Sequence, residues 1–168
     1  MARAGIALGS NLGDRLAQLR AAVTGLSGLS TPGQPILTAQ IYRTEPRDCP
    51  PGSPDFFNTV IEIEFRGNAH ELLEKTRALE LQFGRCKDAA RHAPRLIDID
   101  LLYLGNACCN TESLILPHPR IAERRFVLQP LADIRPDLIL PGQSLTVTRL
   151  LETLHLDERL PALVSAEL

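Results

Sequence analysis

The sequence predicts an α+β fold: a ferredoxin-like antiparallel sheet with helices packed on it and a helical extension at the C-terminus. Strand-like and helix-like segments follow one another over the first hundred residues in the order β-α-β-β-α-β. Two such split βαβ units, each with a right-handed crossover, form an antiparallel sheet with helices on one face. The length of 168 residues and the apolar fraction of 44% suit one ordinary domain, expected to span residues 1–168.

Apolar periodicity defines the first half of this order. Ala4–Gly9 is a short apolar run and is predicted to be a strand. Apolar residues then recur at three- and four-residue steps, the spacing of one helix face, with Asn11 or Asp14 as the N-cap. These residues are Leu12, Leu16, Leu19, Val23 and Leu26. After a turn rich in glycine, serine and proline at residues 28–35, Ile36–Arg43 is predicted to be the second strand.

The second half begins after a loop, Thr44–Pro54, which holds four prolines and a glycine in eleven residues. Alternating residues predict a strand over Phe57–Phe65, and an apolar stripe predicts a helix over Ala69–Phe83. A second loop then leads to a strand over Leu96–Leu104. The C-terminal extension is predicted to contain two helices, near Glu123–Ala132 and Val147–Leu154.

Composition restricts the classes of function. A net charge of −2 and a pI near 6.1 offer no general attraction to nucleic acid or to an anionic membrane. The first residues lack the basic and apolar regions of a signal peptide, and no apolar run approaches the length of a membrane span. The cysteines form no CxxC pattern, which is typical of a reduced compartment. We therefore expect a cytoplasmic protein that binds neither nucleic acid nor membranes.

Two aspartates, Asp98 and Asp100, interrupt the apolar run of the last predicted strand. Residues i and i+2 of a strand face the same side, roughly 6.6–6.8 Å apart along the backbone. Two carboxylates on one face can converge on Mg²⁺, which also binds substrate phosphates. Taken alone, the pair fits the solvent side of a half-buried sheet equally well, although aspartate is disfavoured in strands and like charges repel.

A run of cations lies directly before these aspartates. Four permanent cations fall within eleven residues of the loop: Arg85, Lys87, Arg91 and Arg95. Arginine makes bidentate contacts with phosphate oxygens. By itself this segment fits a solvated basic loop better than a binding site. Beside two carboxylates, however, it predicts phosphoryl transfer, in which metal ions bridge the phosphates and arginines neutralise the charge that develops.

Weaker signals come from four other positions. His118 lies between two prolines, which would fix its ring, and Arg124 adds a cation; a plain surface turn explains this segment better when it is taken alone. Asn58 follows two phenylalanines. It fits two interpretations equally, as a reader of a heteroaromatic ring edge or as a cap of the strand. Gly9 opens a strand-to-helix turn whose amides could face an anion, but the turn matches neither the Walker pattern nor GxGxxG.

Seven short blocks of sequence, taken in their order along the chain, form a more specific pattern. The most specific is PRLIDIDLLYLG at 94–105, which contains both aspartates. The others are GSNLGD at 9–14, YRTEP at 42–46, PDFFN at 54–58, ELQFGR at 80–85, LPHPR at 116–120 and RRFVLQPLADI at 124–134. From about Ile6 to Pro141, the chain resembles the 6-hydroxymethyl-7,8-dihydropterin pyrophosphokinase family of folate biosynthesis.

This resemblance implies that ATP donates pyrophosphate to the hydroxymethyl group of 6-hydroxymethyl-7,8-dihydropterin, giving AMP and the pterin pyrophosphate. It implies a monomer with two Mg²⁺ ions held by Asp98 and Asp100, and Asp98 close enough to take the substrate's hydroxyl proton. The implied catalytic set is Arg85, Arg95, Asp98 and Asp100. The implied ATP-binding set is Arg77, Glu80, Arg85, Lys87, Arg91, His92, Arg95, His118 and Arg124. The implied pterin-binding set is Gly9, Thr44, Phe56, Asn58, Asp98 and Phe126, with Tyr42 helping to shape the pocket.

Three positions depart from the family pattern. Phe56 stands where some members have tyrosine, His92 where some have tryptophan, and residues 47–53 replace an apolar-glycine turn. None of these changes removes a metal ligand or a principal phosphate-binding arginine. The loops at 44–54 and 84–95 are expected to be mobile without ligand and to close over the substrates, which would exclude water.

Two other functions are alternatives to this one. An RNA-binding module of the same fold would use the cations at 85–95, but such modules stack bases on sheet aromatics, and aromatic residues make up only 4% of this chain. A metal-dependent phosphohydrolase would share the aspartates and arginines and release phosphate to water. Salt-dependent RNA binding would favour the first alternative, and the identity of the product separates the second.

Overall fold

A computed structural model of the chain describes residues 1–46, 51–84, 96–154, 161–164 and 168. The first half contains β1 (Ala2–Ser10), α1 (Arg15–Ser27), β2 (Leu37–Thr38), β3 (Ile41–Thr44), β4 (Phe56–Phe65) and α2 (Ala69–Gln82). The second half contains β5 (Asp98–Leu104), β6 (Cys109–Asn110), β7 (Ile115–Leu116), a 3₁₀ turn (Ile121–Glu123), α3 (Arg125–Ile134), α4 (Val147–Thr153) and β8 (Ala162–Val164).

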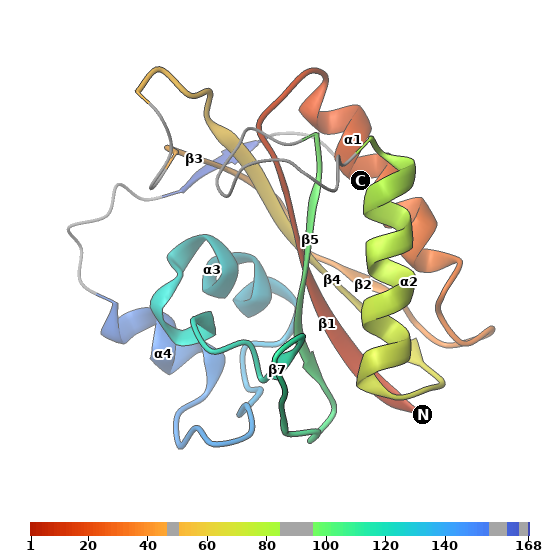
Figure 1. Cartoon of the computed structure of the whole chain (residues 1–168). Coiled ribbons are helices and arrows are strands. Elements are labelled where there is room, and N and C mark those ends of the chain that lie inside the picture. Colours follow the sequence, from red (N-terminus) through yellow and green to blue (C-terminus); the bar gives the residue numbers. More distant parts are fainter. Residues whose placement is uncertain (47–50, 85–95, 155–160, 165–167) are drawn as a thin grey trace.

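One antiparallel sheet organises the fold (Figure 1). Its strands lie in the order β5-β1-β4-β3-β8, and the short β2 also pairs with β4. β1 therefore lies between β5 and β4, which are the two strands that carry the strongest polar signals of the sequence. β6 and β7 form a separate hairpin. The predicted combination of helices with an antiparallel sheet is confirmed.

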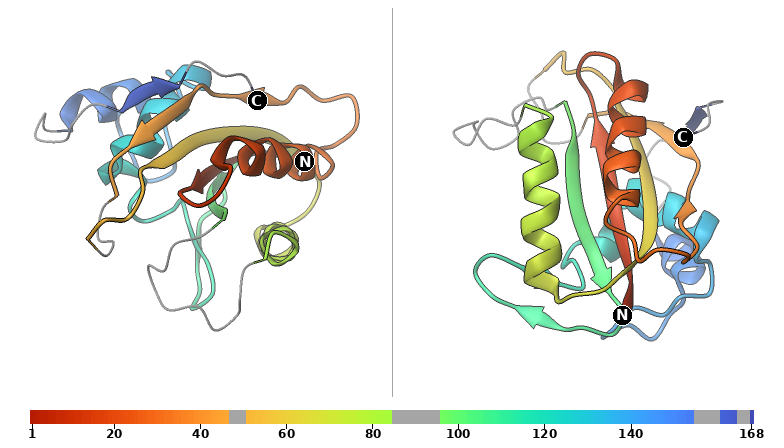
Figure 2. Two further views of the ribbon diagram at one scale, coloured as in Figure 1. Left: turned by 90° about the horizontal axis from the view of Figure 1, so that it is seen from above. Right: turned by 90° about the vertical axis from the view of Figure 1, so that its right-hand side faces the viewer.

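Helices cover both faces of this sheet. The two views of Figure 2 place α1 and α2 on one side and α3 and α4 on the other. The helices of the first hundred residues thus share a face, as predicted, while the two C-terminal helices bury the opposite face. Among the described residues, no helix is long and apolar enough to cross a membrane.

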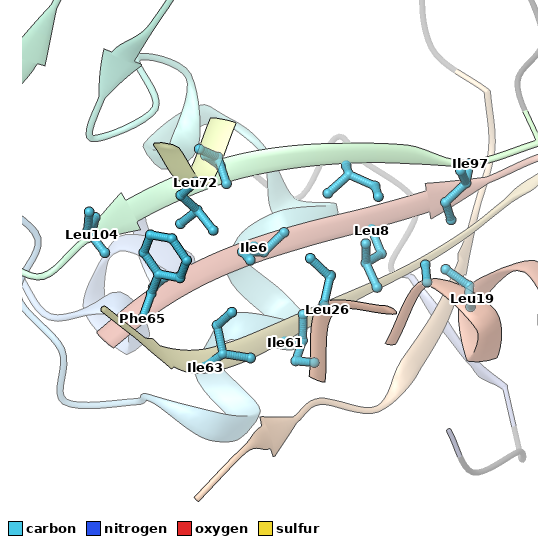
Figure 3. Close-up of a cluster of buried hydrophobic side chains, with 14 of the residues drawn as sticks. Ile6, Leu8, Leu19, Leu26, Ile61, Ile63, Phe65, Leu72, Ile97 and Leu104 are labelled. Atoms are coloured by element: carbon cyan, nitrogen blue, oxygen red, sulfur yellow. The ribbon is translucent and has the colours of Figure 1, made fainter. Parts of the chain in front are cut away.

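The larger core lies between the sheet and the first two helices (Figure 3). Inward residues alternate along β1 and β4, as Ile6 and Leu8 do on one strand and Ile61 and Ile63 on the other. Leucines of α1 and α2 close this layer: Leu19, Leu26 and Leu72. Because each of these side chains is fully buried, each contributes about 1.5–3 kcal/mol relative to exposure.

The second core lies under α3 and α4 and depends on an irregular register. The pairing of β1 with β5 shifts between Gly5 and Ile6, so that two consecutive residues, Leu102 and Tyr103, reach the same cluster. Gly5 makes room for the phenol, because a Cβ at that position would lie 2.2 Å from the Tyr103 ring. This core holds α3 over the face that also carries Asp98 and Asp100.

Helix caps match local sequence signals, whereas some strand boundaries do not. Asp14, one of the two expected caps, accepts a hydrogen bond from the Ala17 amide at 3.0 Å. The predicted strand Ile36–Arg43 is instead divided into β2 and β3, because its register with β4 shifts by one residue between the Thr38–Ile61 and Tyr42–Asn58 pairs. β8 and the β6–β7 hairpin have no clear signal in the sequence and were not predicted.

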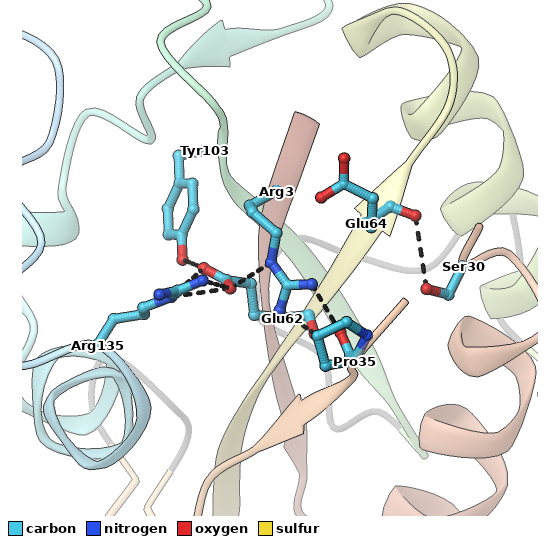
Figure 4. Close-up of polar contacts among 7 residues, drawn as sticks. All are labelled: Arg3, Ser30, Pro35, Glu62, Glu64, Tyr103 and Arg135. Carbon is cyan, nitrogen blue, oxygen red and sulfur yellow. Dashed lines mark hydrogen bonds and ion pairs between the residues drawn. The ribbon is translucent and has the colours of Figure 1, made fainter. Parts of the chain in front are cut away.

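A buried carboxylate joins the sheet to α3 (Figure 4). The Glu62 side chain is only 1% exposed and accepts hydrogen bonds from Arg3 at 2.6 Å, from Arg135 at 2.6–3.0 Å and from the Tyr103 hydroxyl. Burial raises the pKa of Glu62, but its arginine and tyrosine partners outweigh burial, and the net pKa is lowered. Glu62 is therefore an ionised structural anchor between β1, β4, β5 and α3.

Candidate active site

The predicted site residues meet where β1, β4 and β5 lie side by side. Gly9 on β1 is in register with Asp98 of β5 on one side and with Asn58 of β4 on the other. Asn58 is in turn in register with Tyr42 of β3. Residues paired across strands point to the same face, so these four positions form one row across the sheet. The row faces the α3 side, the same side as the buried Glu62.

The two aspartates begin β5 and point to that face together. Asp98 lies beside Gly9 and Asp100 beside Ala7, and both side chains are partly exposed. Arg124 approaches Asp100, with Nη1 and Oδ2 3.5 Å apart, and the Asp100 side chain is 43% exposed. Two accessible carboxylates on one strand face are the donor set by which proteins hold Mg²⁺ that is also bound to substrate phosphates. The residues present therefore fit Mg²⁺. No group of three or more potential ligands occurs among the described residues.

The amide of Asn58 is oriented by a neighbour on β3. Its Nδ2 donates to Thr44 Oγ1 at 2.7 Å, and Asn58 itself is only 6% exposed. Its Oδ1 lies over Gly9, since a Cβ on Gly9 would be 3.0 Å from that oxygen. The backbone of Gly9 is ordinary extended strand, so the lack of a side chain, and not an unusual φ, is what distinguishes this position. The result is a bare strip of backbone between Asn58 and Asp98.

One aromatic ring borders this strip, and a second lies on α3 beside Arg124. Phe56 precedes Asn58 by two residues on β4 and lies near Gly9, where a Cβ would be 3.8 Å from its ring. Phe126 occupies the first turn of α3 and is partly exposed. The Arg124 guanidinium lies 5.6 Å from the centre of the Phe126 ring. One cation therefore contacts both the aspartate side and the aromatic side of the site.

His118 is held in a defined tautomer. Its backbone amide donates to the Leu102 carbonyl at 2.8 Å, and its Nδ1 accepts from the Arg120 amide at 3.1 Å. Burial, together with Arg124 and Arg120, lowers the pKa of His118 to about 4. The ring is consequently neutral near pH 7, and because Nδ1 is an acceptor its proton resides on Nε2. Such a ring can donate a hydrogen bond to a phosphate oxygen without carrying a charge.

Two predicted ATP-binding residues lie on α2 in different surroundings. Glu80 is 3% exposed, and its Oε1 accepts the amide of Ile99, the residue between the two aspartates, at 3.0 Å. Arg77 is exposed and donates to the Ser113 carbonyl at 3.4 Å. Glu80 therefore braces the aspartate-bearing strand from the opposite face of the sheet.

Several of the predicted residues lie outside the described part of the chain. These are Arg85, Lys87, Arg91, His92 and Arg95, together with residues 47–50 of the predicted pterin-side loop. Sequence reasoning also missed a residue that contacts the site. Asp133 of α3 accepts the hydroxyl hydrogen bond of Tyr42, and an exposed polar residue in an amphipathic helix gives no local signal of such a contact.

Comparison with known proteins identifies relatives over most of the chain. The sequence model of the 7,8-dihydro-6-hydroxymethylpterin-pyrophosphokinase (HPPK) family matches residues 5–136. The 2-amino-4-hydroxy-6-hydroxymethyldihydropteridine pyrophosphokinase of Methylorubrum extorquens is 40% identical over 86% of this chain and 89% of its own length. The protein of the same name from Bacillus subtilis is 42% identical over 77% of this chain and 75% of its own length.

Solved structures share the fold. A crystal structure of an HPPK-DHPS protein in complex with substrates has a TM-score of 0.70 at 12% sequence identity, covering 91% of this chain. Plasmodium falciparum HPPK-DHPS with pteroate has a TM-score of 0.69 at 14% identity, covering 90% of this chain. This chain spans 45% and 42% of those two chains, respectively.

Proposed function

The chain belongs to the 7,8-dihydro-6-hydroxymethylpterin-pyrophosphokinase family, and we propose how its site carries out the reaction of that family. The protein is a pyrophosphokinase of folate synthesis that transfers pyrophosphate from ATP to the hydroxymethyl group of 6-hydroxymethyl-7,8-dihydropterin. The substrate hydroxyl oxygen bonds to the β-phosphorus, and the bond from that phosphorus to the α,β-bridging oxygen breaks. AMP leaves with that oxygen, and the pterin keeps the β- and γ-phosphoryl groups.

The roles proposed for the site residues rest on one observation: Asp98, Gly9 and Asn58 are in register in one row across the sheet. Adjacent strands are about 4.8 Å apart, so the two polar residues lie roughly 10 Å apart across the glycine. That separation suits a flat bicyclic substrate read by Asn58 at one end, with its hydroxymethyl group near Asp98. We assign Asp98 as the acceptor of the hydroxyl proton.

The aspartates are proposed to hold two Mg²⁺ ions. When bound there, Mg²⁺ would neutralise phosphate charge and lower the pKa of the substrate hydroxyl. Asp98 and Asp100 would then orient both substrates from one strand face. Support comes from their shared face and accessibility and from the brace that Glu80 provides behind them.

Cations and hydrogen-bond donors are proposed to stabilise the phosphate charge. Arg124 lies next to Asp100 and could turn toward a phosphate, and His118 would donate from Nε2 as a neutral ring. The remaining proposed ATP ligands are Arg77, Glu80, Arg85, Lys87, Arg91, His92 and Arg95. Among these, Arg85 and Arg95 would act on the transferred group, because arginine can contact two phosphate oxygens at once.

The pterin is proposed to bind over the bare strip of β1. Asn58 would read the ring edge with its Oδ1, while its Nδ2 is engaged by Thr44. Phe126 would stack on one side of the ring, and Phe56 would border it on β4. Gly9 supplies the floor of this pocket because it carries no side chain.

We also propose that the chain works as a cytoplasmic monomer and as a single ferredoxin-like domain with a helical C-terminal extension. The strand order β5-β1-β4-β3, with α1 and α2 on one face, supports this topology. Both cores are built on the same sheet, which supports one domain for residues 1–168. The low net charge of −2 supports the absence of nucleic-acid and membrane partners.

The reaction can be tested by ³¹P NMR of the purified protein with ATP and Mg²⁺, run with and without the pterin. Pterin-dependent AMP together with a new diphosphate ester is the expected result, and a chelator should abolish both. Phosphate released in both tubes would instead indicate a phosphohydrolase. Intact ATP in both tubes, with a folded protein, would mean that the site binds ligands without catalysing transfer. RNA binding that weakens steeply with salt would then favour the RNA-binding alternative.

A further inference from the structure

A polar contact joins the last turn of α3 to the strand that borders the site. Both carboxylate oxygens of Asp133 accept the Tyr42 hydroxyl, at 3.1 Å and 3.0 Å. Oδ2 of Asp133 also accepts the backbone amide of Gln40 at 3.3 Å. Asp133 therefore contacts β3 and the residue just before it, at positions 91 and 93 residues away in sequence.

The two partners of this contact carry opposite walls of the candidate pterin pocket. On β3, Tyr42 is in register with Asn58, and Thr44 accepts the Asn58 amide two residues farther along. On α3, Phe126 precedes Asp133 by seven residues, or about two turns, so both lie on the same side of the helix roughly 10 Å apart along its axis. A link between Asp133 and β3 therefore constrains where Phe126 lies relative to Asn58.

The protonation states of the two side chains keep Tyr42 as the hydrogen-bond donor and Asp133 as the acceptor. Burial and the neighbouring Asp133 raise the pKa of the Tyr42 hydroxyl, which keeps it protonated as a donor. Burial raises the pKa of Asp133, while its hydrogen bonds from Tyr42 and Gln40 oppose that rise. Gln129, one turn earlier on α3, also contacts the Tyr42 hydroxyl. The phenol is thus held by the same side of α3 that carries Phe126.

The remainder of α3 is anchored independently of β3. Leu128 and Leu131 are fully buried in the second core, and Arg135, next after the helix, binds Glu62 of β4. Loss of the Asp133 contact would therefore leave α3 seated on the sheet and release the β3 side of the pocket. This separates a role in positioning from a role in folding.

We propose that Asp133 is a positioning residue of the pterin pocket. It holds Tyr42 and the start of β3 against α3, and so sets the gap between Phe126 and the Thr44–Asn58 pair. This inference rests on the proposed pterin-binding role of those residues. Asp133 does not touch the substrate and acts through Tyr42.

The test is a double-mutant cycle on pterin affinity. Asp133→Ala, Tyr42→Phe and the double variant are compared with the wild type by calorimetric titration with the pterin in the presence of a non-hydrolysable ATP analogue. Each single variant should weaken pterin binding about five- to tenfold, the effect of one lost hydrogen bond. The double variant should lose no more pterin affinity than the single variant that loses most. Affinity for the ATP analogue alone should not change.

Control variants separate this role from charge and folding effects. Asp137→Ala removes another exposed carboxylate, four residues later, and should leave pterin affinity unchanged. Asp133→Asn keeps an oxygen acceptor for the Tyr42 hydroxyl and should retain most of the affinity. If Asp133→Ala does not fold, Tyr42→Phe carries the test, because it keeps the ring and removes only the hydroxyl.

The outcomes also distinguish this inference from the proposed function. A wild-type protein that does not bind the pterin would overturn the assignment of the pocket. A wild-type protein that binds the pterin, with Asp133→Ala and Tyr42→Phe variants that bind it equally well, would overturn only the positioning role. Additive losses in the double variant would show that the two residues act separately and would also contradict the proposal.

Discussion

Gly9→Ala is the substitution that tests the bare strip between Asn58 and Asp98 most directly. The added methyl group would lie 3.0 Å from Asn58 Oδ1 and 3.8 Å from the Phe56 ring. Comfortable carbon contacts lie at about 3.5–4.0 Å, so the Asn58 side chain must retreat by a few tenths of an ångström. Its hydrogen bond to Thr44, at 2.7 Å, opposes that retreat.

The expected cost falls on the ligand more than on the fold. A methyl group rises about 1.5 Å above the backbone on which the pterin ring would lie, so the ring must lift or shift toward Phe126. Adding one methyl group to a well-packed site costs about 1–3 kcal/mol. If most of this cost appears only in the complex, pterin affinity should fall by roughly 5- to 150-fold. Affinity for ATP alone should be unchanged, because the strip is proposed to hold only the pterin.

The assay is a pair of calorimetric titrations, one with pterin and one with a non-hydrolysable ATP analogue, combined with a thermal melt. Gly25→Ala is the matched control, since its methyl group would also meet a neighbour at 3.0 Å, the Leu79 side chain, but on α1 in the other core. That control should keep wild-type pterin affinity. Wild-type pterin binding by a folded Gly9→Ala variant would refute the argument that the ring lies over this glycine.

Three further results are expected. Asp100→Asn should lower turnover by at least a hundredfold while pterin affinity changes little, because the proposed metal ions on the phosphates depend on this carboxylate more than the pterin ring does. Equal turnover would remove Asp100 from the proposed metal site. Glu62→Gln should destabilise the fold by about 2–3 kcal/mol, or roughly 4–12 °C in Tm at pH 7, since it removes the buried charge that both arginine partners contact. Because the pKa of Glu62 is lowered in the folded state, the difference in stability from wild type should shrink as the pH falls below its ordinary 4.5. The pKa of His118 is about 4 in the folded state and 6.5 ordinarily, so the unfolded chain takes up this proton first as the pH falls, and the stability of the fold should decline between those two pH values. The His118→Gln variant should show a smaller decline in Tm over that pH range. An NMR titration of the wild type should show no His118 midpoint above pH 5.

The candidate site could be predicted from sequence largely where local periodicity decides it. A strand alternates its side chains, so Asp98 and Asp100 had to share a face wherever that strand lay. The same alternation puts Asn58 and Glu62 on one face of their strand. The resemblance to a known family added which ligands these residues are expected to bind. Periodicity could not show that one half of that face carries the candidate site while the other half buries Glu62 under a helix.

The tertiary structure decided the relations between segments that are distant in sequence. Gly9 lies between Asn58 and Asp98, as its proposed role requires, only because β1 lies between β4 and β5, an order that strand periodicity does not encode. The contact of Asp133 with Tyr42 spans 91 residues and leaves no pattern in either segment. Side-chain alternation along a strand follows from backbone geometry that is local to a few residues. Which strands and helices become neighbours depends on burying both faces of the sheet at once, and only the folded chain as a whole satisfies that condition.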